Sequence, residues 1–410
     1  MIVLVLNAGS SSLKFKLLES ESECVLSRGV VERIGSSSAP ARFVCTDKRG
    51  AVVQDVAGEG YAGALEHVLA SLVEGDGAPL ASLDDVQAVG HRIAHGGDVF
   101  TCSVAIDDDV VATIERFAEL APLHNPPALA VIDHCRRLFG PSKLQVAAFD
   151  TAFHQTMPAR NYVYPIPYRY YADMGIRRYG FHGTSHKYVS RRAAEFLGKS
   201  RRDLKMITCH LGAGASVCAI DHGISMDTSM GFTPLDGIVM GTRSGSVDPA
   251  IITTIMEREN LTPAQMDAVL NRESGMLGVS GVSGDLRELK EAVAVGNERA
   301  ELAYDIFLTS IRRMIGAYFF ELAGVDVIVC TAGVGENDPY ARRLIFRGLE
   351  PFGIRIDQER NMEVGKADRR ISTDDSTVEV LVVPTDEEAE IARDVSLIAA
   401  GVDISDPYSD

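Results

Sequence analysis

The chain has 410 residues, a length that predicts two or three domains with a sizeable core. A composition of 46% hydrophobic and 24% charged residues is typical of globular proteins, and a net charge of −17 argues against nonspecific nucleic-acid binding. We find neither a signal peptide nor an apolar run of transmembrane length, so we expect a cytoplasmic protein without a membrane partner. The seven cysteines are scattered without a CxxC pair, which predicts free thiols.

The chain opens with a strand, a small-residue turn and a second strand. Residues 2–6 form an apolar run typical of a buried strand, and residues 13–17 alternate like its partner. The turn between them, NAGSSS at residues 7–12, has backbone amides and hydroxyls that can cradle a phosphate or hold a hydrated metal ion. A plain β-turn is the alternative interpretation of this stretch.

The next segments alternate helices with strands. Apolar spacing predicts helices over residues 61–72 and 107–120, with a strand at 86–89 leading into GHRIAHGG. Arg92, which lies between two histidines there, offers a planar fork suited to a carboxylate, although a surface ion pair is equally compatible. The sequence APLHNPP breaks the helical pattern, and a new helix begins near Asn125.

The stretch from residue 149 to residue 186 concentrates titratable side chains. A strand at residues 144–149 delivers Asp150 at its carboxyl end, where α/β folds commonly bind ligands. We interpret the stretch as a hinge region beside the reacting centre, with residues 160–171 as an ordered connector. A helix is predicted over 186–198; its end, GKS, is not a P-loop, because residue 193 is alanine where that motif requires glycine.

A second strand, small-residue turn and strand follow at residues 205–220 and repeat the layout of the amino terminus, which suggests a duplicated domain. Beyond them, Arg243 lies between glycines in a loop and can approach a small anion. Glycine loops are also predicted at 281–287 and 332–337. The second of these follows a helix at 301–322 and a strand at 325–330, a layout suited to an adenosine pocket.

The carboxyl-terminal part is predicted to hold a strand at residues 378–383 and a helix at 388–398. Two glutamates, Glu387 and Glu388, stand where this helix begins. Acidic residues in a first turn are favoured by the helix dipole, and they also suit a Mg²⁺ ion shared with nucleotide phosphates.

Taken together, these stretches resemble the acetate kinase family, within the larger group that shares the fold of actin, sugar kinases and heat-shock chaperones. The resemblance runs from Asn7 to Glu388 and rests on NAGSSSLK, GHRIAHGG, APLHNPP, FDTAFHQTMP, YGFHGTSH, HLGAGAS, TPLDG, MGTRSG, AGVGEN and PTDEE. It implies an α/β fold of two duplicated ribonuclease H-like (actin-like ATPase) domains with a cleft between them. The expected domains are residues 1–150, completed by the helix at 386–410, and residues 151–385.

The family transfers the γ-phosphoryl group of ATP reversibly to a short-chain carboxylate, giving ADP and an acyl phosphate. The resemblance therefore implies acetate kinase activity with Mg²⁺, or Mn²⁺ as an alternative, in a homodimer. It assigns metal binding to Asn7 and Glu387, catalysis to Asp150, His182 and Arg243, and substrate binding to Arg92, Ala94, Leu123, Phe181 and Pro234. It assigns ATP binding to Ser10, Ser12, Lys14, His210, Leu211, Gly212, Ala213, Gly214, Asp285, Leu286, Arg287, Gly333, Val334, Gly335, Glu336 and Asn337.

Elementary chemistry agrees with these assignments. Phosphoryl transfer needs positioning and positive charge more than covalent help. A carboxylate acceptor is already ionised at pH 7, so we expect Asp150 to position the arginines or the metal rather than to abstract a proton. The alternatives are that His182 is a core histidine and that Asp150 caps a following helix.

Two positions depart from the family pattern. Ala213 replaces the usual asparagine of HLGNG, which raises the question of another phosphoryl donor such as pyrophosphate, although the intact AGVGEN stretch favours ATP. Ala94 replaces the usual valine, as in propionate kinases of the family. One methylene is worth only about 1–3 kcal/mol in such a pocket, so we expect both acetate and propionate to be used.

Two other classes of protein are less compatible with the sequence. An ATP-gated binding module without acyl transfer would not need the set of Arg92, Arg243 and Asp150. A sugar kinase is disfavoured because no cluster of Asn, Asp and Glu for a sugar accompanies a catalytic aspartate in the amino-terminal half.

Overall fold

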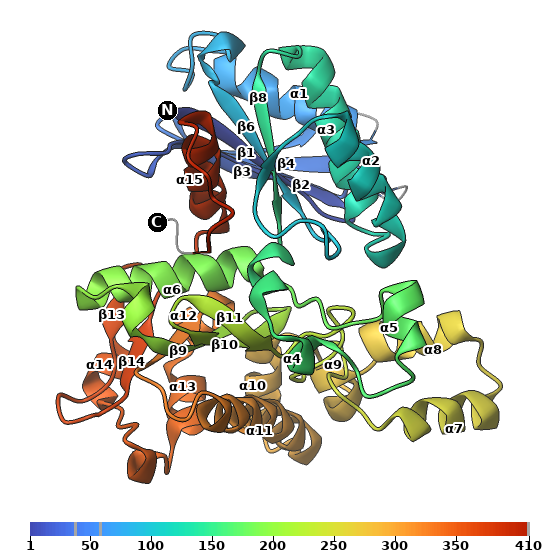
Figure 1. Ribbon diagram of the computed structural model, residues 1–410, viewed down its shortest axis with the longest axis vertical. Helices are drawn as coiled ribbons and strands as arrows, with labels where there is room; N and C mark the ends of the chain where they lie inside the picture. Colours follow the sequence, from blue (N-terminus) through green and yellow to red (C-terminus); the bar gives the residue numbers. More distant parts are fainter. Residues whose placement is uncertain (37–38, 57–59, 408–410) are drawn as a thin grey trace. The chain divides into compact units, whose positions relative to one another are not determined.

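The computed structural model describes residues 1–36, 39–56 and 60–407, and the chain divides into two compact units (Figure 1). Unit 1 is Met1–Gln155 with Asp386–Asp410, and unit 2 is Thr156–Thr385. The first crossing between units therefore falls inside the stretch that the sequence marks as a hinge. The last three residues of the predicted 386–410 segment lie outside the described residues.

Unit 1 contains a mixed sheet of eight strands in its described part, in the order β5-β4-β3-β2-β1-β6-β8-β7. Strands β1, β6 and β8 are parallel, and the other pairings are antiparallel. The strands are β1 (Ile2–Ala8), β2 (Ser12–Glu19), β3 (Cys24–Glu32), β4 (Ala41–Asp47), β5 (Gly50–Val56), β6 (Ala88–Ile93), β7 (Val104–Ala105) and β8 (Leu144–Phe149). The predicted strands at 2–6, 13–17 and 144–149 are confirmed, whereas the one predicted at 86–89 begins at Ala88 and runs on through Arg92.

Helices cover both faces of this sheet, because β1 is apolar on both sides. Leu4 and Leu6 belong to the core that α1 (Gly60–Val73) and α3 (Asn125–Phe139) complete. The helix α15 (Glu387–Ala399) covers the opposite face (Figure 1). A Cβ at Gly90 would lie 2.6 Å from Ile391 of α15, so this helix packs directly against the backbone of β6.

One helix of unit 1 is shorter than predicted. The segment 107–120 is not a single helix: α2 spans Asp108–Arg116, and a short 3-10 helix, η2 (Ala118–Leu120), follows. The side chain of Asp107 caps α2 by accepting a hydrogen bond from the amide of Val110.

Unit 2 is built on a six-stranded sheet in the order β11-β10-β9-β12-β14-β13. Strands β9, β12 and β14 are parallel, and β10, β11 and β13 pair antiparallel to their neighbours. The strands are β9 (Lys205–Leu211), β10 (Ala215–Asp221), β11 (Ile224–Thr228), β12 (Val327–Thr331), β13 (Arg369–Arg370) and β14 (Glu379–Val382).

Within unit 2, α6 (Gly183–Leu197) packs on one face of the sheet and the long helix α11 (Glu298–Glu321) on the other (Figure 1). The helix α11 buries Phe307, Ile311 and Ile315 in the core, as its amphipathic pattern predicts. The remaining helices are α4 (Ala159–Tyr162), α5 (Arg169–Met174), α7 (Pro249–Glu259), α8 (Pro263–Arg272), α9 (Gly275–Ser280), α10 (Leu286–Ala294), α12 (Ala332–Asn337), α13 (Pro339–Phe346) and α14 (Gln358–Met362).

Three sequence predictions in unit 2 need correction. The connector at 160–171 carries two short helices, α4 and α5. The helix predicted from residue 186 begins at Gly183. The stretch 332–337, predicted as a glycine loop, is the short helix α12. This helix begins immediately after β12, with Ala332 in the left-handed region at a φ of 62°.

The two units share one topology. The order β3-β2-β1-β6-β8 in unit 1 matches β11-β10-β9-β12-β14 in unit 2, with the same parallel and antiparallel pairings. The duplication inferred from two strand–turn–strand patterns is therefore confirmed at the level of the fold.

Among the described residues, no helix is long and apolar enough to cross a membrane. No disulfide joins any of the seven cysteines, all of which lie in the described part of the chain, in agreement with the predicted thiols.

Candidate active site

Unit 1 gathers polar side chains at the carboxyl ends of its three parallel strands. Leu6 of β1 is in register with His91 of β6, and Ile93 of β6 with Phe149 of β8. The residues that follow in each strand are therefore brought to one edge of the sheet, as is usual for ligand sites in α/β folds. This edge carries Asn7, Arg92 and Asp150.

The guanidinium of Arg92 is held by two hydrogen bonds to one carboxylate. Its Nε donates to Asp150 Oδ1 at 3.0 Å and its Nη2 to Asp150 Oδ2 at 2.5 Å, while Nη1 donates to Asn7 Oδ1 at 3.2 Å. The Asp150 side chain is only 2% exposed, so this is a buried bidentate pair rather than a surface ion pair. Asp150 does not cap a helix, which rules out that alternative.

Burial alone would lower the pKa of Arg92, but the negative charges of Asp150 and Glu387 outweigh burial and raise it. Arg92 is therefore a permanent cation within this cluster.

The two glutamates at the start of α15 differ in their surroundings. Glu388 forms an ion pair with Lys16 at 3.2 Å, and Lys16 also donates to Asp386 at 2.6 Å. Burial, and next the charge of Asp150, raises the pKa of Glu387 to about 7, although Arg92 offsets part of the effect. Glu387 thus lies in a region with an excess of negative charge, which a cation would relieve.

The first small-residue turn belongs to the same unit. The amide of Gly9 donates to Ser12 O at 2.8 Å, and the hydroxyl of Tyr61 donates to the carbonyl of Gly9. Ser10 and Lys14 are exposed to solvent beside this turn. The turn is therefore fixed by its own backbone while its polar side chains stay accessible.

In unit 2 the equivalent turn between β9 and β10 lies beside two side chains that the sequence analysis predicts to be catalytic. A Cβ built on Gly214 would lie 3.3 Å from His182 Nε2 and 3.6 Å from Arg243 Nη1. A Cβ built on Gly212 would lie 3.7 Å from His210 Nε2. Five residues that the sequence predicted for phosphate binding and catalysis therefore meet at this turn, namely His182, His210, Gly212, Gly214 and Arg243.

Arg243 is a cation without an acidic partner. Its Nη1 donates to the carbonyl of Pro234 at 3.0 Å and contacts Met240 Sδ at 3.4 Å. Burial lowers its pKa, and no carboxylate of the described residues lies within ion-pairing distance. A largely buried guanidinium without a counter-charge is a site for an anion.

His182 is not simply a core histidine. It is the residue before α6 and has a left-handed backbone, with φ of 57°. Its ring stacks on His210 at a centroid distance of 4.2 Å, and its Nδ1 is 2.9 Å from Ser216 Oγ. The edge carrying Nε2 lies beside Gly214, so the histidine is oriented toward the turn.

Unit 2 also contains a cavity of about 530 Å³, large enough for a nucleoside. It is lined by eight of the residues predicted to bind ATP, namely Gly212, Ala213, Asp285, Leu286, Arg287, Gly333, Val334 and Asn337. Asp285 caps α10 and forms an ion pair with Arg287 at 2.8 Å, which lowers the pKa of Asp285 to about 2. These eight predicted residues come from three separate segments of the chain, and all of them line one cavity.

Five predicted ATP ligands of unit 2 do not line the cavity, namely His210, Leu211, Gly214, Gly335 and Glu336. Glu336 Oε1 accepts hydrogen bonds from the amides of Ala332 at 2.9 Å and Thr385 at 3.1 Å. A Cβ at Gly335 would lie 3.2 Å from the backbone of Cys330. Gly335 and Glu336 therefore hold α12 against the sheet and shape the cavity from behind.

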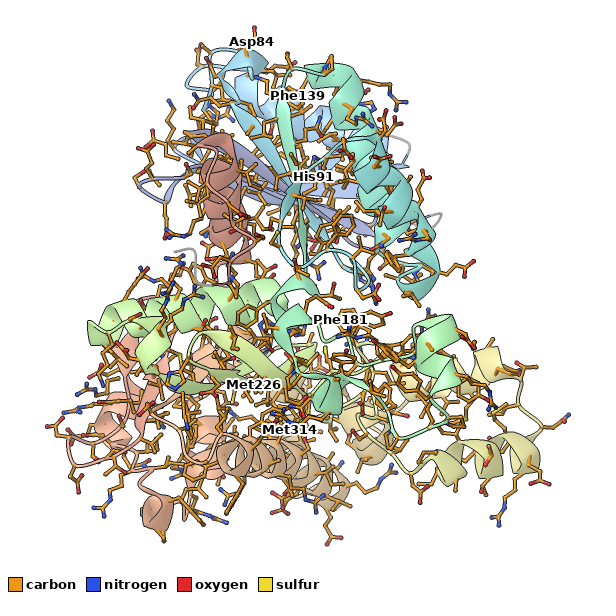
Figure 2. All side chains as sticks on the ribbon, viewed as in Figure 1. Asp84, His91, Phe139, Phe181, Met226 and Met314 are labelled. Atoms are coloured by element: carbon orange, nitrogen blue, oxygen red, sulfur yellow. The ribbon has the colours of Figure 1, made fainter. Side chains whose placement is uncertain are left out.

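The residues predicted for the apolar wall occupy different environments. Ala94 is buried in unit 1, whereas the side chain of Leu123 is 52% exposed. Phe181 belongs to the hydrophobic core of unit 2 (Figure 2). Pro234 contributes its carbonyl to Arg243.

Sequence reasoning missed several residues of these sites. Lys290 and Asp338 line the cavity and form an ion pair at 3.0 Å. Two further residues were also missed: Ser216, which contacts His182 directly, and His186, which contacts Ser216. A helix position facing the cavity gives no local sequence signal, so only the fold identifies Lys290.

The duplicated topology, the cavity and the unpaired guanidinium define a protein of the duplicated ribonuclease H-like (actin-like ATPase) class. Comparisons with known proteins agree. The family model described as the Acetokinase family matches residues 2–393. The acetate kinase of Alkaliphilus metalliredigens (strain QYMF) is 49% identical over 394 residues, covering 96% of this chain and 99% of that protein.

Solved structures give the same result. The crystal structure of Porphyromonas gingivalis acetate kinase matches with a TM-score of 0.93 and 45% identity, covering 97% of this chain and 99% of that one. A propionate kinase from Francisella tularensis matches with a TM-score of 0.88 and 38% identity, covering 96% and 98% of the two chains. The chain belongs to the acetokinase family, a family of nucleotide-using phosphotransferases.

Proposed function

We propose that the protein is an acetate kinase, which transfers the γ-phosphoryl group of ATP reversibly to acetate and forms acetyl phosphate and ADP. The observation that carries this proposal is the guanidinium of Arg243, which is largely buried without a carboxylate partner and lies beside Gly214 and His182. A cation without a counter-charge favours binding of an anion such as a carboxylate or a phosphoryl group, and the family supplies the chemistry.

Unit 1 contributes the carboxylate Asp150 and the cation Arg92, and we propose that both serve the same reaction. Because Asp150 already accepts two hydrogen bonds from Arg92, its role is to orient that guanidinium. A carboxylate substrate is ionised at neutral pH, so the reaction requires no general base. Positive charge that is already in place where negative charge is shared in the transition state supplies most of the rate enhancement.

The nucleoside is proposed to bind in the cavity of unit 2, with its phosphates directed along Gly212 and Gly214. Ala213 lines this cavity with a methyl group where the family usually presents an amide. The backbone amides of the turn remain, so ATP stays the proposed donor. An activity assay that compares ATP with pyrophosphate as the phosphoryl donor, at equal concentration, tests this proposal.

A divalent cation fits the residues of unit 1. Among the described residues, no group of three or more His, Cys, Asp or Glu side chains could hold a metal alone. This suits Mg²⁺, which commonly uses one or two carboxylates together with nucleotide phosphates. We propose Glu387 and Asn7 as its protein ligands, because Glu388 is engaged by Lys16. When bound, the ion neutralises charge on the phosphates.

Propionate is a second proposed substrate. Ala94 is buried and offers a smaller wall than the family's usual valine. Since one methylene changes affinity by only about 1–3 kcal/mol, discrimination between the two acids is expected to be modest. An acetate preference above roughly a thousandfold would contradict this part of the proposal. A homodimer in the cytoplasm is the further expectation from the family resemblance.

The test is hydroxamate trapping of the acyl phosphate formed from ATP and acetate, with Arg243→Ala as the inactive variant. Arg258→Ala, on an exposed part of α7, is the matched control and should retain full activity. Absence of acyl hydroxamate from both acetate and propionate with folded wild-type protein would refute the proposal.

A further inference from the structure

A chain of three buried side chains runs from the sheet of unit 2 to His182, the histidine proposed to act in the reaction. Thr208 Oγ1 is 2.7 Å from His186 Nδ1, His186 Nε2 is 2.8 Å from Ser216 Oγ, and Ser216 Oγ is 2.9 Å from His182 Nδ1. Thr208, His186 and Ser216 are all 0% exposed. The chain is a direct consequence of the fold, because Thr208 and Ser216 lie on the paired strands β9 and β10, and His186 projects from α6.

The direction of these hydrogen bonds follows from the chemistry of Thr208. Within the described part of the chain, its hydroxyl contacts His186 Nδ1 and no other hydrogen-bonding group. A buried hydroxyl hydrogen without an acceptor is costly, by about 1–3 kcal/mol, so Thr208 donates to His186 Nδ1. A neutral imidazole that accepts at Nδ1 carries its proton on Nε2.

The remaining two hydrogen bonds of this chain determine the tautomer of His182. His186 Nε2 then donates to Ser216 Oγ, and the single hydroxyl hydrogen of Ser216 donates to His182 Nδ1. His182 consequently carries its proton on Nε2, the nitrogen that lies beside Gly214 and Arg243.

Two further observations favour a neutral His182. Its Nε2 lies beside the same glycine, Gly214, as the guanidinium of Arg243, so a second positive charge there would be unfavourable. It also stands at the amino terminus of α6, a helix of 15 residues, where the helix dipole disfavours a cation.

We propose that Thr208, His186 and Ser216 are positioning residues that fix His182 as a neutral imidazole with its proton on Nε2, where it donates to the phosphoryl group being transferred. This inference rests on the proposed function for the identity of the acceptor, but the tautomer itself does not depend on it. Arg243 would then supply positive charge, and His182 a directed hydrogen bond.

The tautomer is measured directly by nitrogen NMR on protein with ¹⁵N-labelled histidine, with the His182 signals assigned from a His182→Gln variant. The wild-type protein should show a protonated Nε2 and an unprotonated Nδ1 at His182. Thr208→Val keeps the shape of the side chain but removes the hydroxyl, and it should place part of the proton population on Nδ1. A wild-type His182 that is protonated on Nδ1, or an unchanged tautomer in Thr208→Val, would overturn the proposal.

Kinetics give the second readout. Thr208→Val should lower kcat about tenfold, the loss of one net hydrogen bond in the transition state, with the KM for ATP changed less than twofold. Thr208→Ser should restore kcat. Thr228→Val is the matched control, because Thr228 is equally buried but its hydroxyl donates to the carbonyl of Val217 at 3.3 Å.

The outcomes separate the two proposals. An equal loss of kcat in Thr208→Ser and Thr208→Val, or in the Thr228→Val control, would show a structural effect and refute the relay. A wild-type protein without acetate kinase activity would refute the proposed function, and the NMR result would still decide the tautomer.

Discussion

Asp150 and Arg92 form a bidentate pair in which the carboxylate side chain is almost completely buried, with one of the two hydrogen bonds at 2.5 Å. The pair joins the ends of the parallel strands β6 and β8 and directs Nη1 of Arg92 toward Asn7. Its geometry follows from the strand register, since the amide of Asp150 donates to the carbonyl of Ile93 at 2.9 Å.

Replacing Asp150 with asparagine should therefore reduce both activity and stability. The variant leaves Arg92 without its nearest counter-charge, which should lower the free energy of unfolding by about 2–4 kcal/mol. We expect kcat to fall at least a hundredfold, because the guanidinium is no longer held in place. Denaturant unfolding and the hydroxamate assay measure the two effects.

Asp133→Asn is the matched control for this prediction. Asp133 pairs with Arg137 at 2.8 Å, but both side chains are more than 60% exposed, with values of 63% and 64%. Exposed pairs contribute little, so stability should change by less than about 0.5 kcal/mol and activity should not change. A similar loss in both variants would show that burial of the Asp150 pair is not what matters.

Gly214→Ala tests the convergence of His182 and Arg243. The added methyl group would lie 3.3 Å from the His182 ring and 3.6 Å from Arg243 Nη1, in the space proposed for the phosphoryl group. We expect kcat/KM to fall at least a hundredfold, while the protein remains folded because the ring can shift by a few tenths of an ångström.

The control for this substitution is Gly316→Ala in α11. A Cβ there meets nothing within 4 Å, and the position is an ordinary helical one. Alanine should raise the free energy of unfolding by about 0.5–1 kcal/mol and leave activity unchanged. Full activity of Gly214→Ala would argue that phosphate does not pass beside this glycine.

Two buried histidines of unit 1 should make the protein sensitive to acid. Burial lowers the pKa of His91 and that of His95 to about 4, from an ordinary value of 6.5. Between pH 6.5 and 4 the unfolded chain therefore binds more protons than the folded one, so stability falls as the pH falls through this window. Each histidine lowers the free energy of unfolding by up to about 3 kcal/mol at the acid end of this pH range.

His91→Gln should remove its share of this pH dependence. The side chain of glutamine can still contact Gln145, which lies 2.9 Å from His91 Nε2. Unfolding free energies measured at pH 8 give the intrinsic cost of the substitution, since the histidine is neutral in both states there. The difference between pH 8 and pH 5 should shrink in the variant; an unchanged difference would contradict the assignment to His91.

The sequence predicts those parts of the fold that have a strong local signal. Residues 144–149 are an unbroken apolar run between polar segments, and they form β8 with the same bounds. The two strand–turn–strand patterns revealed the duplication because their small-residue turns are as distinctive as their strands. Residues 160–171 lack such a period, and their two short helices were missed.

The site was harder to predict where residues act through tertiary contacts. The conformation of α12 depends on Glu336, whose carboxylate binds the amides of Ala332 and Thr385, a contact that no local pattern reveals. Thr208 and Ser216 look like ordinary strand residues in the sequence. They become significant only because α6 places His186 between them.

Metal binding at Glu387 should depend on pH. The pKa of Glu387 is raised to about 7, so below pH 7 the carboxyl group is largely protonated in the free protein. Because a metal ligand must be deprotonated, binding of the preformed complex of Mg²⁺ with ATP at pH 6 should release close to one proton from Glu387. The affinity for Mg²⁺ should rise up to about tenfold per pH unit as the pH approaches 7, and level off above it. Calorimetry in buffers of different ionisation enthalpy measures the released proton.

Glu387→Gln should abolish this proton release and weaken Mg²⁺ binding, whereas Glu388→Gln, which removes one of the two acidic partners of Lys16, should leave the release intact. The same shift affects folding with the opposite sign to that of the histidines. Since the folded pKa of Glu387 exceeds its ordinary value of 4.5, its contribution is fully present below pH 4.5 and is lost as the pH rises toward 7. Saturating Mg²⁺ and ATP should counteract that loss, because they bind the folded protein with Glu387 deprotonated. Proton release that persists in Glu387→Gln and disappears in Glu388→Gln would reassign the metal ligand to Glu388.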